Sequence, residues 1–430
     1  MERSVNYHAG CRIRGTVCLP GDKSIAHRVL LLGSMATGTT YAKGIPAGED
    51  IDATLRCIKG LRVACERAGD SVSVIGIGKK RFPAPRTVLD CGASASTLRM
   101  LLGVLAGAGT RTTLAGHPSL LKRPIDRVIV PLTAMGATFD ASGENRFAPV
   151  TIVSPRAPVP IDYELPVASA QVKSAVIMAA LRAERGRTTL RGAIHSRDHT
   201  ERLVPRMGGS VVVTPNAIMV EPGHLDAIAC TIPGDPSTAA FYAAAAAVLR
   251  NSKVTIRGMC TNPTRTGFFE ALSWMGGSVT VEDLNDTGAE PVGDVTVRWT
   301  PLKGITVPED VVPMLVDEVP LLVLTAVCAE GETVIRGISE LRVKETDRVD
   351  CMVDGLRRMG ANIEVEPDAI RVLGGCRLHG AHLDPRGDHR MSMMFTIAAM
   401  AASGDSVIHG VECEAKSFPG FFDSLAGVLS

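Results

Sequence analysis

The short stretch LPGDKS at residues 19–24 returns almost unchanged as IPGDPS at residues 232–237, about half a chain later. Each copy is a Pro-Gly turn followed by polar residues of the kind that begin helices. Such a turn is a natural place for a chain to pass from one domain to another. The echo therefore predicts two related halves, as expected for 430 residues, which exceed what one core usually supports.

A shorter pattern repeats within the halves. A β-type run ends in glycine six times, with spacings of 66 to 79 residues, at Gly44, Gly116, Gly192, Gly258, Gly337 and Gly410. Most of these runs lead into a polar loop, a helical pattern, an MGA or MGG turn and another strand, as in WMGGSVTV (274–281). β-Branched residues favour strands, and a glycine in the left-handed conformation ends a helix. We therefore predict six β–loop–α–β units.

These units define an α/β fold of two domains. Residues 21–231 are expected to form one domain of three units, and residues 1–20 with 232–430 the other. A ligand site is expected in the cleft between the domains, because binding sites concentrate at such clefts.

Composition excludes several classes of protein. A hydrophobic share of 45% and a net charge of +1 indicate a globular chain that binds neither nucleic acid nor membrane surfaces through its overall charge. The eleven cysteines show no C-x-x-C pair and no zinc spacing, so we expect buried thiols in a reducing cytosol and no metal. The N-terminus lacks the apolar region of a signal peptide, and no apolar run is long enough to span a membrane. A soluble cytoplasmic protein is expected.

Charged residues concentrate in the loops after the repeat glycines. GDKSIAHR (21–28) places Lys23 and Ser24 at a helix N-terminus, where free N–H groups and the helix dipole attract phosphate or carboxylate. DEVPLL (317–322) sets Asp317 against an apolar run, where an unpaired carboxylate is costly. For single clusters, a structural role without ligand binding remains an alternative. Ser169 also suits an N-cap, and KETDR (344–348) also suits a solvated helix face.

The joint pattern is more specific than any one cluster. The cations expected to face the site are Lys23, Arg28, Arg99, Arg123, Arg348, Arg390 and Lys416. Two phosphates and two carboxylates carry roughly −5 to −6, which so many cations suit well. Arginine clamps such groups with two hydrogen bonds, whereas lysine acts as a point charge. The loops therefore predict a site for two highly anionic small molecules.

These motifs carry a resemblance to a known family. PGDKSIAHR (20–28), LKRPIDR (121–127), VASAQVKSA (167–175), LRVKETDR (341–348), GDHRMSM (387–393) and AKSFPGF (415–421) resemble, in order, the 5-enolpyruvylshikimate-3-phosphate synthase family of enolpyruvyltransferases. The resemblance implies two similar domains, each of three inverted βαβαββ-type units, in agreement with the six-fold repeat.

The resemblance also implies a reaction of the shikimate pathway. The enolpyruvyl group of phosphoenolpyruvate passes to the 5-hydroxyl of shikimate 3-phosphate, and phosphate is released by addition and elimination through a tetrahedral intermediate. No metal or organic cofactor is implied, and a monomer is expected.

Site residues follow from the resemblance by matching position. Those expected to hold shikimate 3-phosphate are Lys23, Ser24, Arg28, Ser169, Gln171, Asp317 and Lys344. Those expected to hold phosphoenolpyruvate are Lys23, Ala95, Arg123, Gln171, Arg348, Arg390 and Lys416. Asp317, with Lys23, is expected to take the hydroxyl proton, and Glu345 to protonate the methylene carbon. Arg99 and His389 are expected to support the site.

The spacing within KETDR carries its own expectation. Lys344 and Arg348 are four residues apart, so we expect them to share a helix face with Glu345 beside them. Neighbouring cations should lower the pKa of Glu345, whereas a general acid needs it raised. We therefore expect Glu345 to be competent only when the substrate anions offset the cations.

One loop departs from the family pattern. GASASTLR (92–99) has Ala93 and Ala95 where the family usually reads Gly-Asn-Ser-Gly-Thr. The methyl group of Ala95 is expected to crowd the inhibitor glyphosate more than the substrate, so we expect reduced glyphosate sensitivity. His199 also replaces a tyrosine of some members.

Three alternatives were weighed against this interpretation. The related UDP-N-acetylglucosamine enolpyruvyltransferase typically carries a reactive loop cysteine, but no cysteine lies between Cys91 and Cys230. An RNA-cyclase-like function conflicts with the near-zero net charge and the aromatic content of 4%. A non-catalytic anion-binding protein remains open because of the altered GASAST loop.

Overall fold

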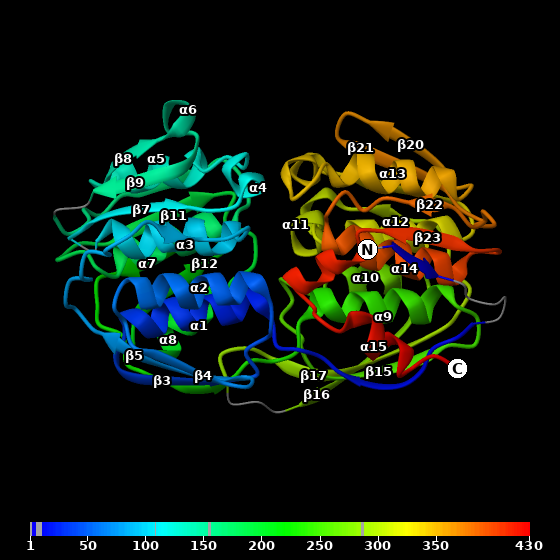
Figure 1. Ribbon diagram of the computed structural model, residues 1–430, viewed down its shortest axis with the longest axis horizontal. Coiled ribbons are helices and arrows are strands. Elements are labelled where there is room, and N and C mark those ends of the chain that lie inside the picture. The colour runs from blue at the N-terminus through cyan, green and yellow to red at the C-terminus, as the bar shows by residue number, and fades with distance from the viewer. Residues whose placement is uncertain (1, 6–10, 108, 154–155, 285–287) are drawn as a thin grey trace. The chain divides into compact units, whose positions relative to one another are not determined.

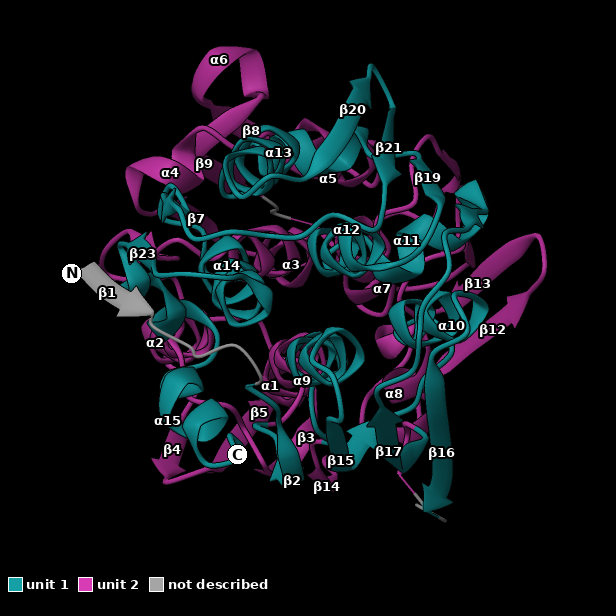
Figure 2. Cartoon of the chain, turned by 90° about the vertical axis from the view of Figure 1, so that its right-hand side faces the viewer, with its two compact units in different colours: residues 1–20, 233–286, 291–430 teal, residues 21–232, 287–290 magenta. Residues whose placement is uncertain are grey.

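The computed structural model describes residues 2–5, 11–107, 109–153, 156–284 and 288–430 of the chain. The chain divides into two compact units, coloured separately in Figure 2. Unit 2 comprises residues 21–232 and 287–290, and unit 1 comprises residues 1–20, 233–286 and 291–430. The chain therefore passes from one unit to the other within its two Pro-Gly turns, after Pro20 and after Ile232.

Unit 2 contains helices and strands in alternation (Figure 1). Its helices are α1 (Lys23–Met35), α2 (Glu49–Gly60), α3 (Ala95–Ala106), α4 (Pro118–Leu121), α5 (Asp126–Ala134), α6 (Ser142–Asn145), α7 (Ala170–Ala180) and α8 (His199–Arg206). Its strands are β3 (Thr37–Lys43), β4 (Cys65–Ala68), β5 (Ser71–Ile77), β6 (Leu89–Asp90), β7 (Arg111–Ala115), β8 (Thr138–Ala141), β9 (Phe147–Val153), β10 (Asp162–Leu165), β11 (Thr188–Gly192), β12 (Ser210–Thr214), β13 (Ala217–Glu221) and β14 (Ala229–Thr231).

Unit 1 has the same alternation. Its α-helices are α9 (Pro236–Val248), α10 (Gly267–Trp274), α11 (Val312–Leu315), α12 (Val319–Cys328), α13 (Arg348–Arg358), α14 (His389–Ala401) and α15 (Phe421–Ala426). Its 3-10 helices are η1 (Glu309–Val311), η2 (Ser339–Val343) and η3 (Val411–Lys416). Its strands are β1 (Glu2–Val5), β2 (Arg14–Cys18), β15 (Lys253–Cys260), β16 (Ser278–Leu284), β17 (Val292–Arg298), β18 (Thr306–Val307), β19 (Glu332–Arg336), β20 (Asn362–Glu366), β21 (Ala369–Leu373), β22 (His382–Leu383) and β23 (Ser406–His409).

The described strands form six small sheets, three in each unit. In unit 2 the orders are β14-β3-β5-β4, β6-β7-β9-β8 and β10-β11-β13-β12. In unit 1 they are β16-β17-β15-β2, β18-β19-β21-β20 and β1-β23-β22. A typical sheet joins one parallel pair, such as β10 with β11, to an antiparallel hairpin, such as β12 with β13. The repeat seen in the sequence is therefore one sheet and its helices, and the predicted α/β fold is confirmed.

Each unit is built around three helices that are buried on nearly all sides. These are α1, α3 and α7 in unit 2, and α9, α12 and α14 in unit 1. A helix that is apolar all round belongs in a core. The run of alanines in α9 (residues 243–247) shows the pattern most clearly, since every one is fully or almost fully buried. Most of the predicted site residues lie at the polar ends of these six helices.

The repeat glycines have the conformation that the pattern requires. Five of the six have φ between +59° and +77°, a region that disfavours residues with a side chain. Gly116 is needed for a different reason, because a Cβ there would lie 2.3 Å from the carbonyl oxygen of Gly92.

The cysteines and the apolar helices bear on two further expectations. All eleven cysteines are free, and burial raises the pKa of Cys328 and Cys351 to about 12. The expectation of buried thiols is wrong for Cys18, which is exposed. No single described helix is long and apolar enough to cross a membrane. The pair Glu309–Leu315 and Val319–Cys328 reaches such a length and composition only together, across a bend of 112°.

Candidate active site at the helix N-termini

Most of the predicted site residues lie at the N-terminal ends of core helices. Lys23 and Ser24 begin α1 after the N-cap Asp22, whose side chain accepts a hydrogen bond from the backbone of Ile25 at 2.9 Å. Ser169 is the N-cap of α7, which is the structural role predicted as its alternative to ligand binding. Free N–H groups and the positive end of the dipole make such ends suitable for anions.

In unit 2, α3 and α7 bring three polar side chains together. Nη1 of Arg99 donates to Oε1 of Gln171 at 2.7 Å, and Nε2 of Gln171 donates to Oγ of Ser96 at 2.8 Å. Arg99 also donates to the carbonyl of Pro124 at 2.7 Å, which ties down the turn that carries Arg123. The predicted support role of Arg99 thus has a geometric basis. Ser96 was not predicted.

Hydroxyl groups hold the buried guanidinium of Arg28. Its Nε donates to Oγ1 of Thr200 at 2.9 Å and its Nη2 to Oγ of Ser174 at 2.9 Å. Nη1 donates to the carbonyl oxygen of Ser24 at 2.8 Å, while Arg197 donates to Oγ of Ser24 at 3.4 Å. Arg28 is only 3% exposed, so its orientation is set by this network.

The ammonium group of Lys23 has a carboxylate partner that the sequence did not reveal. Its Nζ lies 2.8 Å from Oδ2 of Asp50, in the first turn of α2. Asp50 is one of three acidic residues in the first turn of that helix. Acidic residues at a helix start commonly stabilise the helix dipole, so the sequence gave no sign that Asp50 pairs with Lys23.

In unit 1, Arg348 lies at the centre of three carboxylates. It contacts Asp388 at 2.7 Å, Glu345 at 2.7 Å and Asp317 at 3.1 Å. Burial works against the charged guanidinium, but the three carboxylates outweigh burial and raise the pKa of Arg348 above its ordinary value. The structure therefore joins both predicted proton-transfer groups to one fixed cation.

The predicted helix face in KETDR is wrong. α13 begins only at Arg348, and Lys344 and Glu345 precede it in a non-helical segment after η2. The cause is Asp347, which acts as the N-cap and accepts the backbone N–H of Asp350 at 3.0 Å. An N-cap residue has extended backbone angles and so cannot continue a helix from its N-terminal side. Lys344 still lies 3.6 Å from Asp317.

Arg390, in the first turn of α14, contacts two carboxylates. Its guanidinium lies 3.6 Å from Asp317 and 3.5 Å from Glu318. Glu318, the residue after Asp317 in DEVPLL, is 2% exposed. Its burial, visible only in the fold, identifies it as the partner of Arg390.

The cations of this cluster are already paired with carboxylates. Lys344, Arg348 and Arg390 are matched by four carboxylates, those of Asp317, Glu318, Glu345 and Asp388. The prediction of a cation-rich site did not anticipate this pairing. An incoming anion must therefore compete with carboxylates that already hold the cations.

The remaining predicted residues lie at the edges of these clusters. Lys416 ends η3 and donates to the carbonyl of Gly387 at 2.8 Å. His389 is buried at the start of α14, with its Nδ1 4.0 Å from Asp388. Arg123 is half-buried between α4 and α5, and Ala95 is the buried first residue of α3.

Three side chains with atoms suited to ligate a metal ion lie close together elsewhere in unit 2. One oxygen or nitrogen atom from each of Asp198, His199 and Glu290 falls within 4.8 Å of the others. Arg202 already pairs with Asp198 at 2.8 Å and lies 4.0 Å from Glu290. A guanidinium thus supplies the positive charge there.

The comparisons with known proteins agree with one another. Residues 7–425 match the family model of EPSP synthase (3-phosphoshikimate 1-carboxyvinyltransferase). A protein named 3-phosphoshikimate 1-carboxyvinyltransferase from Roseiflexus sp. (strain RS-1) is 44% identical over 97% of both chains, and one from Bacillus cereus (strain G9842) is 41% identical over 96% of both.

Solved structures show the same relationship. EPSP synthase from Acinetobacter baumannii has a TM-score of 0.88 at 37% identity, covering 100% of this chain and 99% of that one. The enolpyruvyl transferase NikO from Streptomyces tendae has a TM-score of 0.76 at 18% identity, covering 98% of this chain and 96% of that one, so it shows the fold alone.

Proposed function

The chain belongs to the EPSP synthase family, and we propose that it transfers the enolpyruvyl group of phosphoenolpyruvate to the 5-hydroxyl of shikimate 3-phosphate, releasing phosphate. The observation that carries this proposal is the cluster around Arg348, which holds Asp317 and Glu345 at 3.1 and 2.7 Å. Two acids on one cation suit a reaction that moves one proton off oxygen and another onto carbon.

The polar residues at the N-terminal ends of α1 and α7 in unit 2 are proposed to bind shikimate 3-phosphate. Lys23 and Ser24 at the start of α1 and Ser169 at the start of α7 suit a phosphate or hydroxyl groups. Arg28 presents a buried guanidinium whose orientation the hydroxyls of Ser174 and Thr200 fix. Gln171 completes this set, and Asp317 and Lys344 of unit 1 are proposed to bind the same substrate.

The second anion is proposed to bind to cations from both units. For phosphoenolpyruvate these are Lys23, Arg123, Arg348, Arg390 and Lys416, with Gln171 and Ala95 beside them. Arg390 suits a carboxylate because its planar fork can donate two parallel hydrogen bonds. Glu318 orients that fork from 3.5 Å.

Anion binding also prepares the base. Lys344 and Arg390, both 3.6 Å from Asp317, stabilise its charged form in the structure. When substrate anions draw these cations away, Asp317 becomes the better proton acceptor. The pairing of these cations with carboxylates is then part of the mechanism.

The proposed reaction proceeds in two steps. Asp317, with Lys23, takes the proton of the 5-hydroxyl, whose oxygen bonds to C2 of phosphoenolpyruvate while Glu345 protonates C3 to give a methyl group. The resulting tetrahedral intermediate carries both substrates. In the second step a methyl proton returns to Glu345, the bond from C2 to the phosphate oxygen breaks, and phosphate leaves with the proton that Asp317 took from the 5-hydroxyl.

The two units are proposed to be enolpyruvyltransferase domains of three repeats each. We also propose that the protein acts as a cytoplasmic monomer without a metal or organic cofactor.

Phosphate release from the purified protein tests the proposal. With shikimate 3-phosphate and phosphoenolpyruvate present, turnover is expected in the wild type and should fall about 10²- to 10⁴-fold in Glu345→Gln. Glu364→Gln, an exposed change on β20, is the matched control and should retain full activity.

A non-catalytic anion-binding protein is the second candidate, favoured by the altered loop that carries Ala93 and Ala95. That candidate predicts binding of shikimate 3-phosphate without phosphate release in any variant. Calorimetry beside the activity assay separates the two, and wild-type turnover would exclude the binder.

A further inference from the structure

Unit 2 contains a cationic cavity away from the helix N-termini that form the candidate active site. It has a volume of about 400 Å³ and is lined at the C-terminal ends of all three core helices, by Met35 of α1, Gly107 after α3 and Leu181 after α7. None of its lining residues belongs to the proposed active site. The cavity lies wholly within unit 2.

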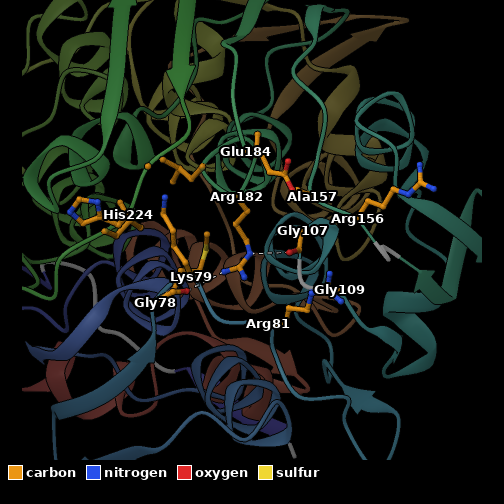
Figure 3. Close-up of a pocket in the computed structure, with 15 residues that line it drawn as sticks. Gly78, Lys79, Arg81, Gly107, Gly109, Arg156, Ala157, Arg182, Glu184 and His224 are labelled. Carbon is orange, nitrogen blue, oxygen red and sulfur yellow. Dashed lines mark hydrogen bonds between the residues drawn. The ribbon is translucent and has the colours of Figure 1, made fainter.

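The lining combines charge with an apolar wall. Its cationic residues are Lys79, Arg81, Arg156 and Arg182, against one acidic residue, Glu184. Figure 3 shows Lys79, Arg182 and His224, from three separate segments, around the hollow, whereas the guanidinium of Arg156 points away from them. Met35, Leu181 and Leu225 supply buried apolar surface.

Arg182 is the fixed element of this cavity. Its guanidinium donates to the carbonyl oxygens of Lys80 at 2.7 Å, Gly107 at 3.1 Å and Gly78 at 3.4 Å. It also lies 5.3 Å from the ring centroid of Phe82. Burial lowers the pKa of Arg182, and no carboxylate pairs with it among the described residues.

A purely structural role accounts for only part of this arrangement. A cation near a helix C-terminus stabilises the dipole, and Arg182 does so at the end of α3. By binding these carbonyl groups, Arg182 also reduces their repulsion of an anion. The charge at each helix end is only about half an elementary charge. The structural role leaves unexplained why the Lys79 side chain also lines the same hollow, beside an apolar wall. An open cavity is not required for capping.

Glycine keeps part of the hollow open. A Cβ built on Gly223 meets nothing within 4 Å, so side chains at this position would enter free space. Gly223 does not need a left-handed backbone, since its φ lies outside that region. A larger residue there is therefore compatible with the fold and would occupy free space at the lining of the cavity.

From these observations we propose that this cavity is a second binding site, which takes a small organic phosphate. A phosphate dianion suits Lys79 together with the remaining N–H donors of Arg182, because arginine and lysine bind phosphate through charge-assisted hydrogen bonds. A cavity of about 400 Å³ is far larger than inorganic phosphate, and its apolar wall suits an organic group.

Phenyl phosphate and inorganic phosphate are the probes for the test. Hydrogen–deuterium exchange of the full chain, with and without each probe, locates binding, and calorimetry measures its strength. The test variants are Lys79→Gln, which removes a charge, and Gly223→Leu, which occupies free space at the lining of the cavity without changing charge. Lys253→Gln, an exposed lysine on β15 in unit 1, is the matched control.

The expected result is slower exchange in segments 78–82, 181–184 and 223–225 with phenyl phosphate, and weaker binding of inorganic phosphate. Both test variants should bind phenyl phosphate about tenfold or more weakly, as expected for loss of a charged hydrogen bond, while Lys253→Gln binds like the wild type. Protection confined to segments 22–28 and 169–175, equal binding by all variants, equal binding of both probes, or no binding at millimolar concentration would each overturn the proposal. This readout does not depend on turnover, so it stands or fails separately from the proposed reaction.

Discussion

The Nε of Arg348 donates to Oδ2 of Asp388 at 2.7 Å, and both side chains are almost fully buried. The other carboxylate oxygen, Oδ1, accepts the backbone N–H of Arg390 at 2.8 Å, so Asp388 is also the N-cap of α14. One carboxylate therefore fixes the start of a core helix and the direction of the central arginine. This relationship sets the geometry of Asp317 and Glu345, which contact the same guanidinium.

Replacing Asp388 by asparagine should separate these two roles. Asparagine keeps the N-cap, but Arg348 loses its most buried counter-charge. We expect α13 and α14 to lose about 3 kcal/mol of opening free energy, typical of breaking a buried pair. Native-state hydrogen exchange measures this locally, which matters because a chain of two units need not unfold in one step.

The control for that measurement is Asp354→Asn in α13, the helix that Arg348 begins. Asp354 pairs with Arg358 at 3.1 Å, but both side chains are exposed, so a loss of at most about 0.5 kcal/mol is expected. Equal losses in the two variants would mean that burial of the Arg348 pair adds nothing.

Asp50→Asn should strengthen substrate binding. The carboxylate of Asp50 competes for the ammonium group of Lys23 from 2.8 Å. Removing this partner is worth about 1 kcal/mol or less, so the KM for shikimate 3-phosphate should fall by up to about fivefold. Steady-state kinetics measure the change, with Asp52→Asn on the same helix as a control that should leave KM unaltered. A raised KM would show instead that Asp50 positions Lys23 productively.

Ala95→Gly should increase inhibition by glyphosate. Ala95 is 6% exposed at the first position of α3, so its methyl group occupies space beside the proposed phosphoenolpyruvate site. Relief of such crowding is worth about 1–3 kcal/mol, or roughly fivefold or more in the inhibition constant. The KM for phosphoenolpyruvate should change much less. Strong inhibition of the wild type, with no gain in Ala95→Gly, would contradict this prediction.

His27 should make stability depend on pH. Burial lowers its pKa from 6.5 to about 3, so the folded chain keeps this imidazole neutral, with Nδ1 2.7 Å from Oγ1 of Thr54. Between those two pKa values the unfolded chain binds the extra proton. Stability should therefore fall by about 1.4 kcal/mol for each pH unit lowered from about 6.5 towards 3.

The variant His27→Gln tests this slope, because glutamine cannot take up the proton. Unfolding followed at several pH values should give a shallower decline for His27→Gln than for the wild type. His117→Gln, at an exposed position, serves as the control. A wild-type slope that His27→Gln leaves unchanged would assign the acid sensitivity to other groups.

Much of the fold could be predicted from local chemistry. The MGG and MGA turns do end helices in the left-handed region, with φ of +96°, +78°, +86° and +94° at Gly136, Gly208, Gly276 and Gly360. The two PGD turns do lead into helices, because Asp22 and Asp235 both act as N-caps. Such features are set by neighbouring residues and are therefore visible in the sequence.

The KETDR segment shows where this reasoning stops. Spacing alone favoured a helix through residues 344–348, whereas the Asp347 side chain accepts the backbone N–H of Asp350 and the helix begins only at Arg348. Helical spacing and N-capping compete within the same five residues, and the sequence does not say which one prevails.

By itself the sequence determined the repeat, the α/β class and which motifs carry charge, since these depend on residues close together in the chain. Only the tertiary structure decided which charges meet. Lys23 with Asp50, Arg390 with Glu318 and Arg348 with Asp388 are 27, 72 and 40 residues apart. Ion pairs of this kind form where the fold brings together segments that are distant in the chain, such as the starts of α1 and α2, and sequence distance carries no information about that proximity.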